Sequence, residues 1–179
     1  MILQANNTIF LCIDMQEKLL PSINNSEEVI KYNKIWFEIA TVLDIPIMVT
    51  EQYPNGLGHT IQSLDLQKFE ASVFEKMTFG NPTLEMKNFL EKSNRNQVII
   101  SGVETHICVF QMARDLVNLG YKVYIAKDAV GSRTKENYEN GLYLLDKSGC
   151  IITNTESALF DLLKIAGTPE FKVLSKLIK

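Results

Sequence analysis

The chain has 179 residues, of which 46% are hydrophobic and 22% charged, as is typical of a folded protein, and its length predicts a single domain over residues 1–179. A net charge of −3 and only three arginines argue against the clustered basic face that nucleic-acid binding requires. The sequence shows neither a signal-peptide pattern nor an apolar run of about 18 residues, so we expect a cytoplasmic protein with no membrane segment.

The first third of the chain alternates apolar runs with a helical pattern. Thr8–Ile13 is apolar without polar alternation, which predicts a strand buried on both faces, and this run stops at Asp14. Ser26–Leu43 has apolar residues at helical spacing and two glutamates after its first residue, which predicts a helix. A second strand is expected at Ile47–Thr50, followed by a loop at Glu51–Gly58.

The middle of the chain continues the alternation. Ser72–Met77 predicts a third strand, and Pro82 suits the first turn of a helix that runs to about Lys92. Gln97–Ser101 predicts a fourth strand, which Gly102 ends.

The last third begins with a predicted helix at Thr105–Leu119, closed by Gly120. The remaining predicted elements are a strand at Tyr121–Ala126, a helix at Lys135–Lys147, a strand at Cys150–Thr153 and a helix at Glu156–Ala166. Strands that alternate with helices indicate a parallel sheet covered on both faces. Right-handed crossovers then favour a doubly wound, three-layer α/β/α sandwich.

Three reactive side chains fall where predicted strands end or the next helix begins. Asp14 follows the first strand, Lys76 lies at the end of the third, and Cys108 lies in the first turn of the helix after the fourth. Ligands of open α/β sheets bind beyond the carboxyl ends of the strands, so we expect the three side chains to meet at one rim.

The segment Ser101–Val109 (SGVETHICV) carries most of the chemical information. A helix N-terminus stabilises anions, so we expect the pKa of the Cys108 thiol to be lowered, and a nearby Lys76 would lower it further. Asp14 could accept the thiol proton and return it to a leaving group, while N–H groups of the first turn could bind an oxyanion. Packing, capping and solvation are the respective alternatives for Cys108, Asp14 and Lys76.

The other cysteines and the histidines are given no catalytic role. Cys12 and Cys150 lie in predicted strands, where packing in the core is the expected state. His106 is two positions from Cys108, and residues at that spacing on a helix do not face each other. His59 follows a glycine-rich turn and is expected on a surface loop.

Three motifs together resemble the isochorismatase-like (cysteine hydrolase) superfamily, which includes nicotinamidases. They are FLCIDMQ around Asp14, FEKMTF around Lys76 and SGVETHICV around Cys108, and the resemblance runs from about Thr8 to Ala166. The loop TEQYPNGLG is similar to that of the isochorismatase-domain-containing subgroup.

The resemblance implies a six-stranded parallel sheet in the order 3-2-1-4-5-6. It implies that Cys108 attacks the substrate, that Asp14 transfers protons and that Lys76 supports the thiolate or the bound intermediate. It also implies a cis peptide bond between Val103 and Glu104, with the N–H groups of Glu104 and Cys108 forming an oxyanion hole, and a homo-oligomeric assembly.

Two positions depart from relatives within the superfamily. Nicotinamidases carry an Asp-x-His metal motif after the second strand, and Gln52 and Pro54 stand at the corresponding positions. Proline has no side-chain ligand atom, so we predict neither this metal nor another cofactor. Isochorismatase itself lacks the nucleophilic cysteine, so Cys108 argues against isochorismate as the substrate.

The resulting prediction is a hydrolase of a small-molecule amide, ester or related C–N bond that works through a thioester on Cys108. Its pocket could include Tyr53, Leu57, Phe79 and Val103. Two alternatives stay open at this point, a thiol-based redox enzyme or sensor and a non-enzymatic binding protein on the same fold. The C-terminal segment Phe171–Lys179 alternates basic and apolar residues and is expected to pack on the body or on a neighbouring subunit.

Overall fold

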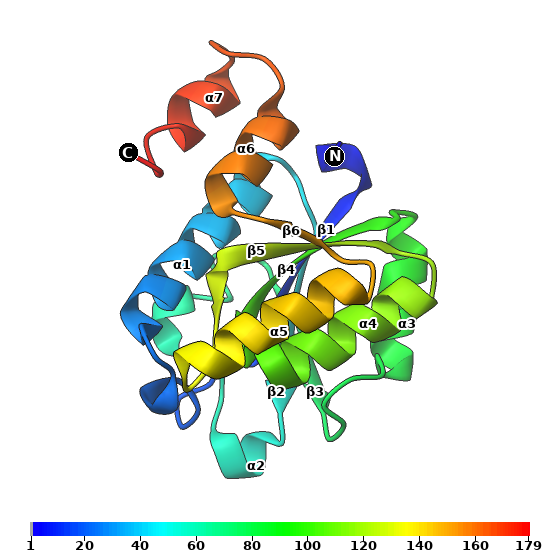
Figure 1. Cartoon of the computed structure of the whole chain (residues 1–179). Coiled ribbons are helices and arrows are strands. Elements are labelled where there is room, and N and C mark those ends of the chain that lie inside the picture. Colours follow the sequence, from blue (N-terminus) through cyan, green and yellow to red (C-terminus); the bar gives the residue numbers. More distant parts are fainter. Residues whose placement is uncertain (1) are drawn as a thin grey trace.

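The computed structural model, which describes residues 2–179, contains a six-stranded parallel sheet in the order β3-β2-β1-β4-β5-β6 (Figure 1). This order confirms the predicted fold, in which β1 and β4 lie side by side at the centre. The strands are β1 Thr8–Ile13, β2 Ile47–Gln52, β3 Ser72–Lys76, β4 Gln97–Val103, β5 Lys122–Gly131 and β6 Ile151–Thr153.

Helices cover both faces of the sheet and make the sandwich three layers deep (Figure 1). On one face α1 and α6 pack on the sheet with α7 against both of them, and α3, α4 and α5 cover the other face. The helices are α1 Ser26–Val42, α2 Pro54–Leu57, α3 Leu84–Ser93, α4 Phe110–Asn118, α5 Lys135–Lys147, α6 Thr155–Leu163 and α7 Pro169–Leu174. Short turns form at Ala5–Asn7, Leu20–Ser22, Gln62–Leu64 and, in π-helical geometry, at Thr105–Val109.

The two central strands are buried along their whole length, which explains why their sequences are continuous apolar runs. On the α1 face, Phe10 of β1 stacks on Trp36 at 5.6 Å between ring centroids. On the opposite face, Met112 and Leu116 of α4 are fully buried in the second core cluster. The sheet is therefore held between two apolar layers, and its polar chemistry is confined to the strand ends.

β5 is longer than the sequence pattern predicts, because it continues from Ala126 to Gly131. The charged pair Lys127–Asp128 interrupts the apolar alternation, and the register with β4 shifts between Ile100 and Gly102. Pairing then resumes beyond the shift and carries β5 to the rim of the sheet. β2 and β4 likewise end two residues later than predicted, at Gln52 and Val103.

Two predicted helix starts are wrong, and the helix predicted to end at Ala166 ends at Leu163. The helix expected to include Pro82 begins at Leu84, because the Thr83 side chain accepts a hydrogen bond from the Met86 N–H and acts as the N-cap. The helix expected to run unbroken from Thr105 begins with the π turn and becomes α-helical only at Phe110. A further turn, α2, forms within the segment predicted to be a loop.

The C-terminal segment packs on the body of the protein. Leu174 of α7 is fully buried against the core, and Leu177 and Ile178 pack partly on the same cluster. No helix within residues 2–179 is both long and apolar enough to cross a membrane.

Candidate functional site

Asp14 lies at the carboxyl end of β1, where the chain turns with a positive φ of 52°. Its carboxylate is fully buried and accepts hydrogen bonds from Thr50 Oγ1 at 2.6 Å and from Lys76 Nζ at 2.7 Å. Burial raises the pKa of Asp14 above its ordinary value, although the charge and hydrogen bond of Lys76 and the hydroxyl of Thr50 oppose this shift. The carboxyl group is therefore a stronger base than an exposed aspartate.

Lys76 is the last residue of β3, which lies two strands away from β1 in the sheet, and its side chain reaches Asp14. Its side chain is fully buried, and Nζ also donates to Gln52 Oε1 at 2.8 Å. Gln52 is itself fixed, because its Nε2 donates to the Met77 carbonyl oxygen at 2.9 Å. The predicted meeting of Asp14 and Lys76 at the rim is thus present in the structure, with Gln52 as a third member.

Cys108 lies in the π turn beyond β4, and its residue is only 5% exposed. The thiol lies close enough to Asp14 and Lys76 for both charges to shift its pKa. Burial and the Asp14 charge raise the pKa of the Cys108 thiol to about 12, and the Lys76 charge only partly opposes them. The prediction of a lowered thiol pKa is therefore wrong, because burial and the neighbouring carboxylate outweigh the helix end and the ammonium.

The peptide bond between Val103 and Glu104 is cis, as the family resemblance implied. Glu104 is buried, and its carboxylate pairs with Arg133 at 2.6 Å. Burial alone would raise the pKa of Glu104, but the hydrogen bonds and charge of Arg133 lower it below its ordinary value. Two residues later, His106 Nδ1 lies 3.0 Å from Ser132 Oγ.

Neither Arg133 nor Ser132 was predicted from the sequence to be a site residue. Both follow β5, and the sequence analysis ended this strand before it reached the rim. One signal was available, because Arg133 is one of only three arginines in the chain. The pairing of Arg133 with Glu104 depends on the extended β5, so spacing alone could not reveal it.

Neither histidine is placed to act as a base for Cys108. The His59 side chain is 74% exposed, and its Nδ1 lies 2.9 Å from Glu51 Oε2, an interaction that raises the pKa of His59. Burial lowers the pKa of His106, whose ring faces Ser132. The choice of Asp14 rather than a histidine as the candidate base agrees with these contacts.

The four predicted pocket residues differ in exposure. Tyr53 and Phe79 are 48% and 51% exposed, and Leu57 is half-buried. Val103 is fully buried in the core cluster on the α1 face, so its side chain does not line an open pocket. Thr105 Oγ1 is buried without a hydrogen-bond partner within residues 2–179, and it lies three positions before Cys108.

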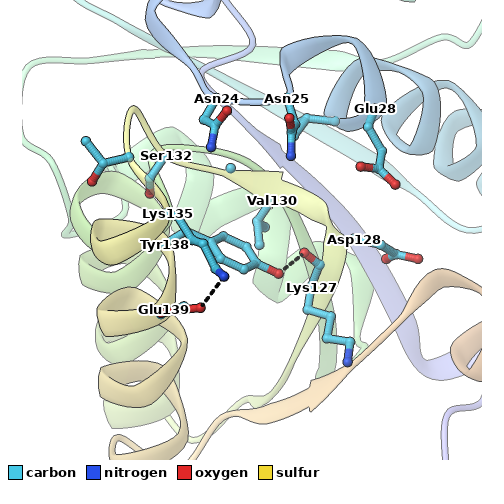
Figure 2. A pocket seen from close by; sticks show the side chains of 13 residues that line it. Asn24, Asn25, Glu28, Lys127, Asp128, Val130, Ser132, Lys135, Tyr138 and Glu139 are labelled. Carbon is cyan, nitrogen blue, oxygen red and sulfur yellow. Dashed lines mark hydrogen bonds and ion pairs between the residues drawn. The ribbon is translucent and has the colours of Figure 1, made fainter.

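A cavity of about 360 Å³ lies apart from the Asp14–Lys76 pair, between the start of α1, the end of β5 and the start of α5 (Figure 2). Figure 2 shows Tyr138 beside it, with its hydroxyl donating to the Lys127 carbonyl oxygen at 2.8 Å. Asp14, Lys76 and Cys108 do not line this cavity. The three candidate site residues are instead almost completely buried near the sheet rim.

Comparisons with known proteins show the family of the chain. The family model of the isochorismatase domain matches residues 8–157. The chain is 37% identical to isochorismatase domain-containing protein 1 of Danio rerio, covering 99% of this chain but only 62% of that relative. It is 36% identical to the secreted isochorismatase effector Isc1 of Phytophthora sojae, covering 99% of this chain and 87% of that protein.

Solved structures extend the similarity to the whole fold. A structure titled MAR1 ribonuclease from Caenorhabditis elegans is 31% identical, has a TM-score of 0.93, and is matched over 99% of this chain and 92% of that one. The YcaC gene product of Escherichia coli, described in its title as an octameric hydrolase of unknown specificity, is 19% identical with a TM-score of 0.87. The match covers 98% of this chain and 90% of YcaC, and at this identity it shows the fold alone.

Proposed function

The chain belongs to the isochorismatase family, and on this premise we propose that it hydrolyses a small-molecule amide or ester through a thioester on Cys108. The observation that carries the proposal is the buried Asp14–Lys76 pair at the rim, whose two charges both act on the pKa of the buried Cys108 thiol. A nucleophile beside a base, with the base oriented by a third group, is the arrangement that covalent catalysis requires.

In the proposed reaction the thiol is neutral at rest and Asp14 acts as the base. Cys108 Sγ bonds to the substrate carbonyl carbon while Asp14 takes the thiol proton and the carbonyl electron pair moves to oxygen. Collapse of this intermediate expels the amine or alcohol, which takes the proton from Asp14. Water then attacks the thioester with Asp14 again as base, releasing the acid and restoring the thiol.

Lys76 and the backbone have supporting roles in this reaction. The Lys76 ammonium favours the ionised form of Asp14 between proton transfers, because its charge lies 2.7 Å from the carboxylate. The N–H groups of Glu104 and Cys108 are the proposed oxyanion donors at the start of the π turn. The unpaired Thr105 hydroxyl is a third group that a bound substrate could satisfy.

The raised thiol pKa favours hydrolysis over redox chemistry. Oxidation of cysteine proceeds through the thiolate, and a thiol with a pKa of about 12 is protonated near neutral pH. Cys12 and Cys150, the other two cysteines, are also buried. A base that ionises the thiol only during attack fits Asp14, whereas a redox sensor would require a thiolate at rest.

We further propose that the reaction needs no metal at the end of β2. Gln52 and Pro54 occupy the positions of the nicotinamidase motif. The Gln52 amide is already engaged, since its oxygen accepts from Lys76 and its nitrogen donates to Met77. The polar groups that remain at the rim suit an organic carbonyl substrate.

A small molecule is the proposed substrate, although the C. elegans structure is titled a ribonuclease. Each of the three arginines already has a partner within the chain. Arg133 pairs with Glu104, Arg114 pairs with Asp115, and Arg95 donates to backbone carbonyl groups. With a net charge of −3, the chain has no overall excess of positive charge to attract a phosphate backbone. Cleavage of RNA that depends on Cys108 would contradict the proposal.

A homo-oligomer is proposed as the working assembly. The E. coli YcaC structure is titled octameric. In this chain Met77, Phe79 and Leu84 are 71%, 51% and 70% exposed, directly after the buried Lys76. These three exposed apolar side chains fall within a span of eight residues, and exposed apolar patches are typical of contact surfaces. A cytoplasmic location is proposed as well, supported by three unpaired cysteines, although the P. sojae relative is named as secreted.

The decisive experiment compares wild-type protein with Cys108→Ala against a panel of small amides and esters. We expect a covalent acyl adduct on Cys108 by mass spectrometry, with turnover abolished in Cys108→Ala and the fold unchanged by circular dichroism. Cys150→Ala is the matched control, because Cys150 is equally buried at 5% exposure but lies just before β6, outside the Asp14–Lys76 site. Normal turnover by Cys108→Ala would refute the mechanism. A Cys108 no more reactive than a free thiol towards a mild electrophile would instead favour a binding protein.

A further inference from the structure

Residues 131–141 contact the turn that carries Cys108. This segment runs from the end of β5 into the first half of α5. The strongest contact joins Arg133 to Glu104, the residue just before the turn. Glu104 Oε2 accepts from the Arg133 backbone N–H and from Nε, both at 3.0 Å, and Oε1 accepts from Nη2 at 2.6 Å. Three donors from one residue thus fix both oxygens of this carboxylate.

Two further contacts join the same segment to the turn. Ser132 Oγ lies 3.0 Å from His106 Nδ1. On α5, a Cβ atom placed on Gly141 would lie 2.8 Å from both the His106 nitrogen and the Thr105 carbonyl carbon. The α5 backbone therefore packs directly on the backbone of the turn, and no side chain separates them.

We infer that Arg133 is a positioning residue that, through the Glu104 carboxylate, holds the Glu104 N–H in the orientation needed to bind the oxyanion at Cys108. The inference rests on the proposed thioester mechanism. A planar guanidinium that bonds both carboxylate oxygens defines an orientation as well as a charge. Because Glu104 is the residue whose N–H is the proposed donor, fixing its side chain limits the movement of its backbone.

The geometry separates this role from direct substrate binding. Arg133 Nε and Nη2 both already donate to Glu104, so the Nε–Nη2 edge of the guanidinium is not free to bind a substrate carboxylate. The Glu104 side chain is 4% exposed, whereas that of Arg133 is 56% exposed. Removal of Arg133 therefore leaves a nearly buried carboxylate without its partner and releases the start of the turn.

The test compares Arg133→Met and Arg133→Lys with the wild type, using the pre-steady-state release of p-nitrophenolate from p-nitrophenyl acetate. We expect Arg133→Met to slow the acylation step on the order of 10-fold to 100-fold with an unchanged KM, as small misplacements of catalytic groups do. Arg133→Lys keeps the charge but loses the fork, so it should recover part of the rate. Lys68→Met is the matched control, because it breaks the exposed Lys68–Glu38 ion pair of 2.6 Å away from the site.

Each outcome decides the inference. A raised KM with a normal acylation rate would make Arg133 a substrate-binding residue and overturn it. A lower Tm with normal acylation in the folded protein would reduce Arg133 to a structural partner of Glu104. If Arg133→Met fails to fold, Arg133→Lys and Glu104→Gln carry the same comparison.

Amide hydrogen exchange distinguishes failure of the inference from failure of the proposed function. If wild-type protein and Cys108→Ala release p-nitrophenolate equally, the thioester mechanism has failed. The positioning role then still predicts faster exchange over residues 103–109 in Arg133→Met and no change in Lys68→Met. Unchanged exchange in Arg133→Met would overturn the inference whatever the activity.

Discussion

At the scale of single residues, the site depends on two charges that have no contact with bulk water. Asp14 and Lys76 are both fully buried, and each is the other's counter-ion at 2.7 Å. A buried ion pair is weak evidence of stability, because desolvation offsets the attraction, but removing one partner leaves an uncompensated charge. Comparing the loss of one charge with the loss of both therefore tests whether the two charges are coupled.

We predict that Lys76→Met lowers the free energy of unfolding by about 3–5 kcal/mol, because it leaves Asp14 buried without its cation. The double variant Asp14→Asn/Lys76→Met should regain part of this loss, since it removes both charges. Urea denaturation of the two variants and the wild type measures the difference. Both variants should be inactive, so stability and activity would change independently. Equal stability of the single and double variants would show that the charges are not coupled.

At the scale of elements, the sequence predicted the exact bounds of the strand and the helix that keep one residue pattern along their whole length. β1 and α5 have the predicted bounds, because one is a fully apolar run and the other a helical pattern with a capping threonine. The π turn at Thr105–Val109 was missed, since its residues continue the helical pattern of α4. The backbone of α5 packs on this segment at Gly141, and such tertiary contacts leave no local pattern in the sequence.

Gly141 tests how closely α5 packs on the π turn. We predict that Gly141→Ala lowers the free energy of unfolding by about 1–3 kcal/mol, although alanine favours helices, because its Cβ would overlap backbone atoms of the turn. It should also slow acylation of Cys108 by displacing the turn. Asn140→Ala is the matched control, since Asn140 is the exposed preceding residue of the same helix. Chemical denaturation and burst kinetics of both variants give the comparison. A Gly141→Ala protein as stable and active as Asn140→Ala would contradict the packing.

At the scale of the whole molecule, the topology rather than any motif brings the site together. The order β3-β2-β1-β4-β5-β6 places the ends of β1 and β4 next to each other and lets Lys76 reach across from β3. The motifs predicted which residues meet, but not the electrostatic result. The sign of the Cys108 shift depends on burial beneath the folded layers, and a sequence pattern does not encode that quantity. The contribution of Arg133 was missed because it follows the extension of β5 to the rim, which depends on pairing with β4 beyond the register shift.

Because all three thiols are buried, we expect the free energy of unfolding to fall as the pH rises through the alkaline range. Burial is the largest cause that raises the pKa of Cys12, Cys108 and Cys150 from 9.0 to about 12. In the unfolded chain these thiols ionise near their ordinary pKa, so above it the unfolded state binds fewer protons than the folded state. Their stabilising contribution is therefore complete below about pH 9 and is lost as the pH rises towards 12.

Cys150→Ala isolates one of these contributions, because Cys150 lies outside the Asp14–Lys76 site. We predict that the stability difference between wild type and Cys150→Ala shrinks by about 1 kcal/mol between about pH 8 and pH 10, since the variant has no thiol to ionise on unfolding at that position. Buried tyrosines also weaken the fold in this range, but they are common to both proteins and cancel in the difference. Urea denaturation at a series of pH values measures it. A difference that stays constant with pH would mean that Cys150 is exposed to water in the folded protein.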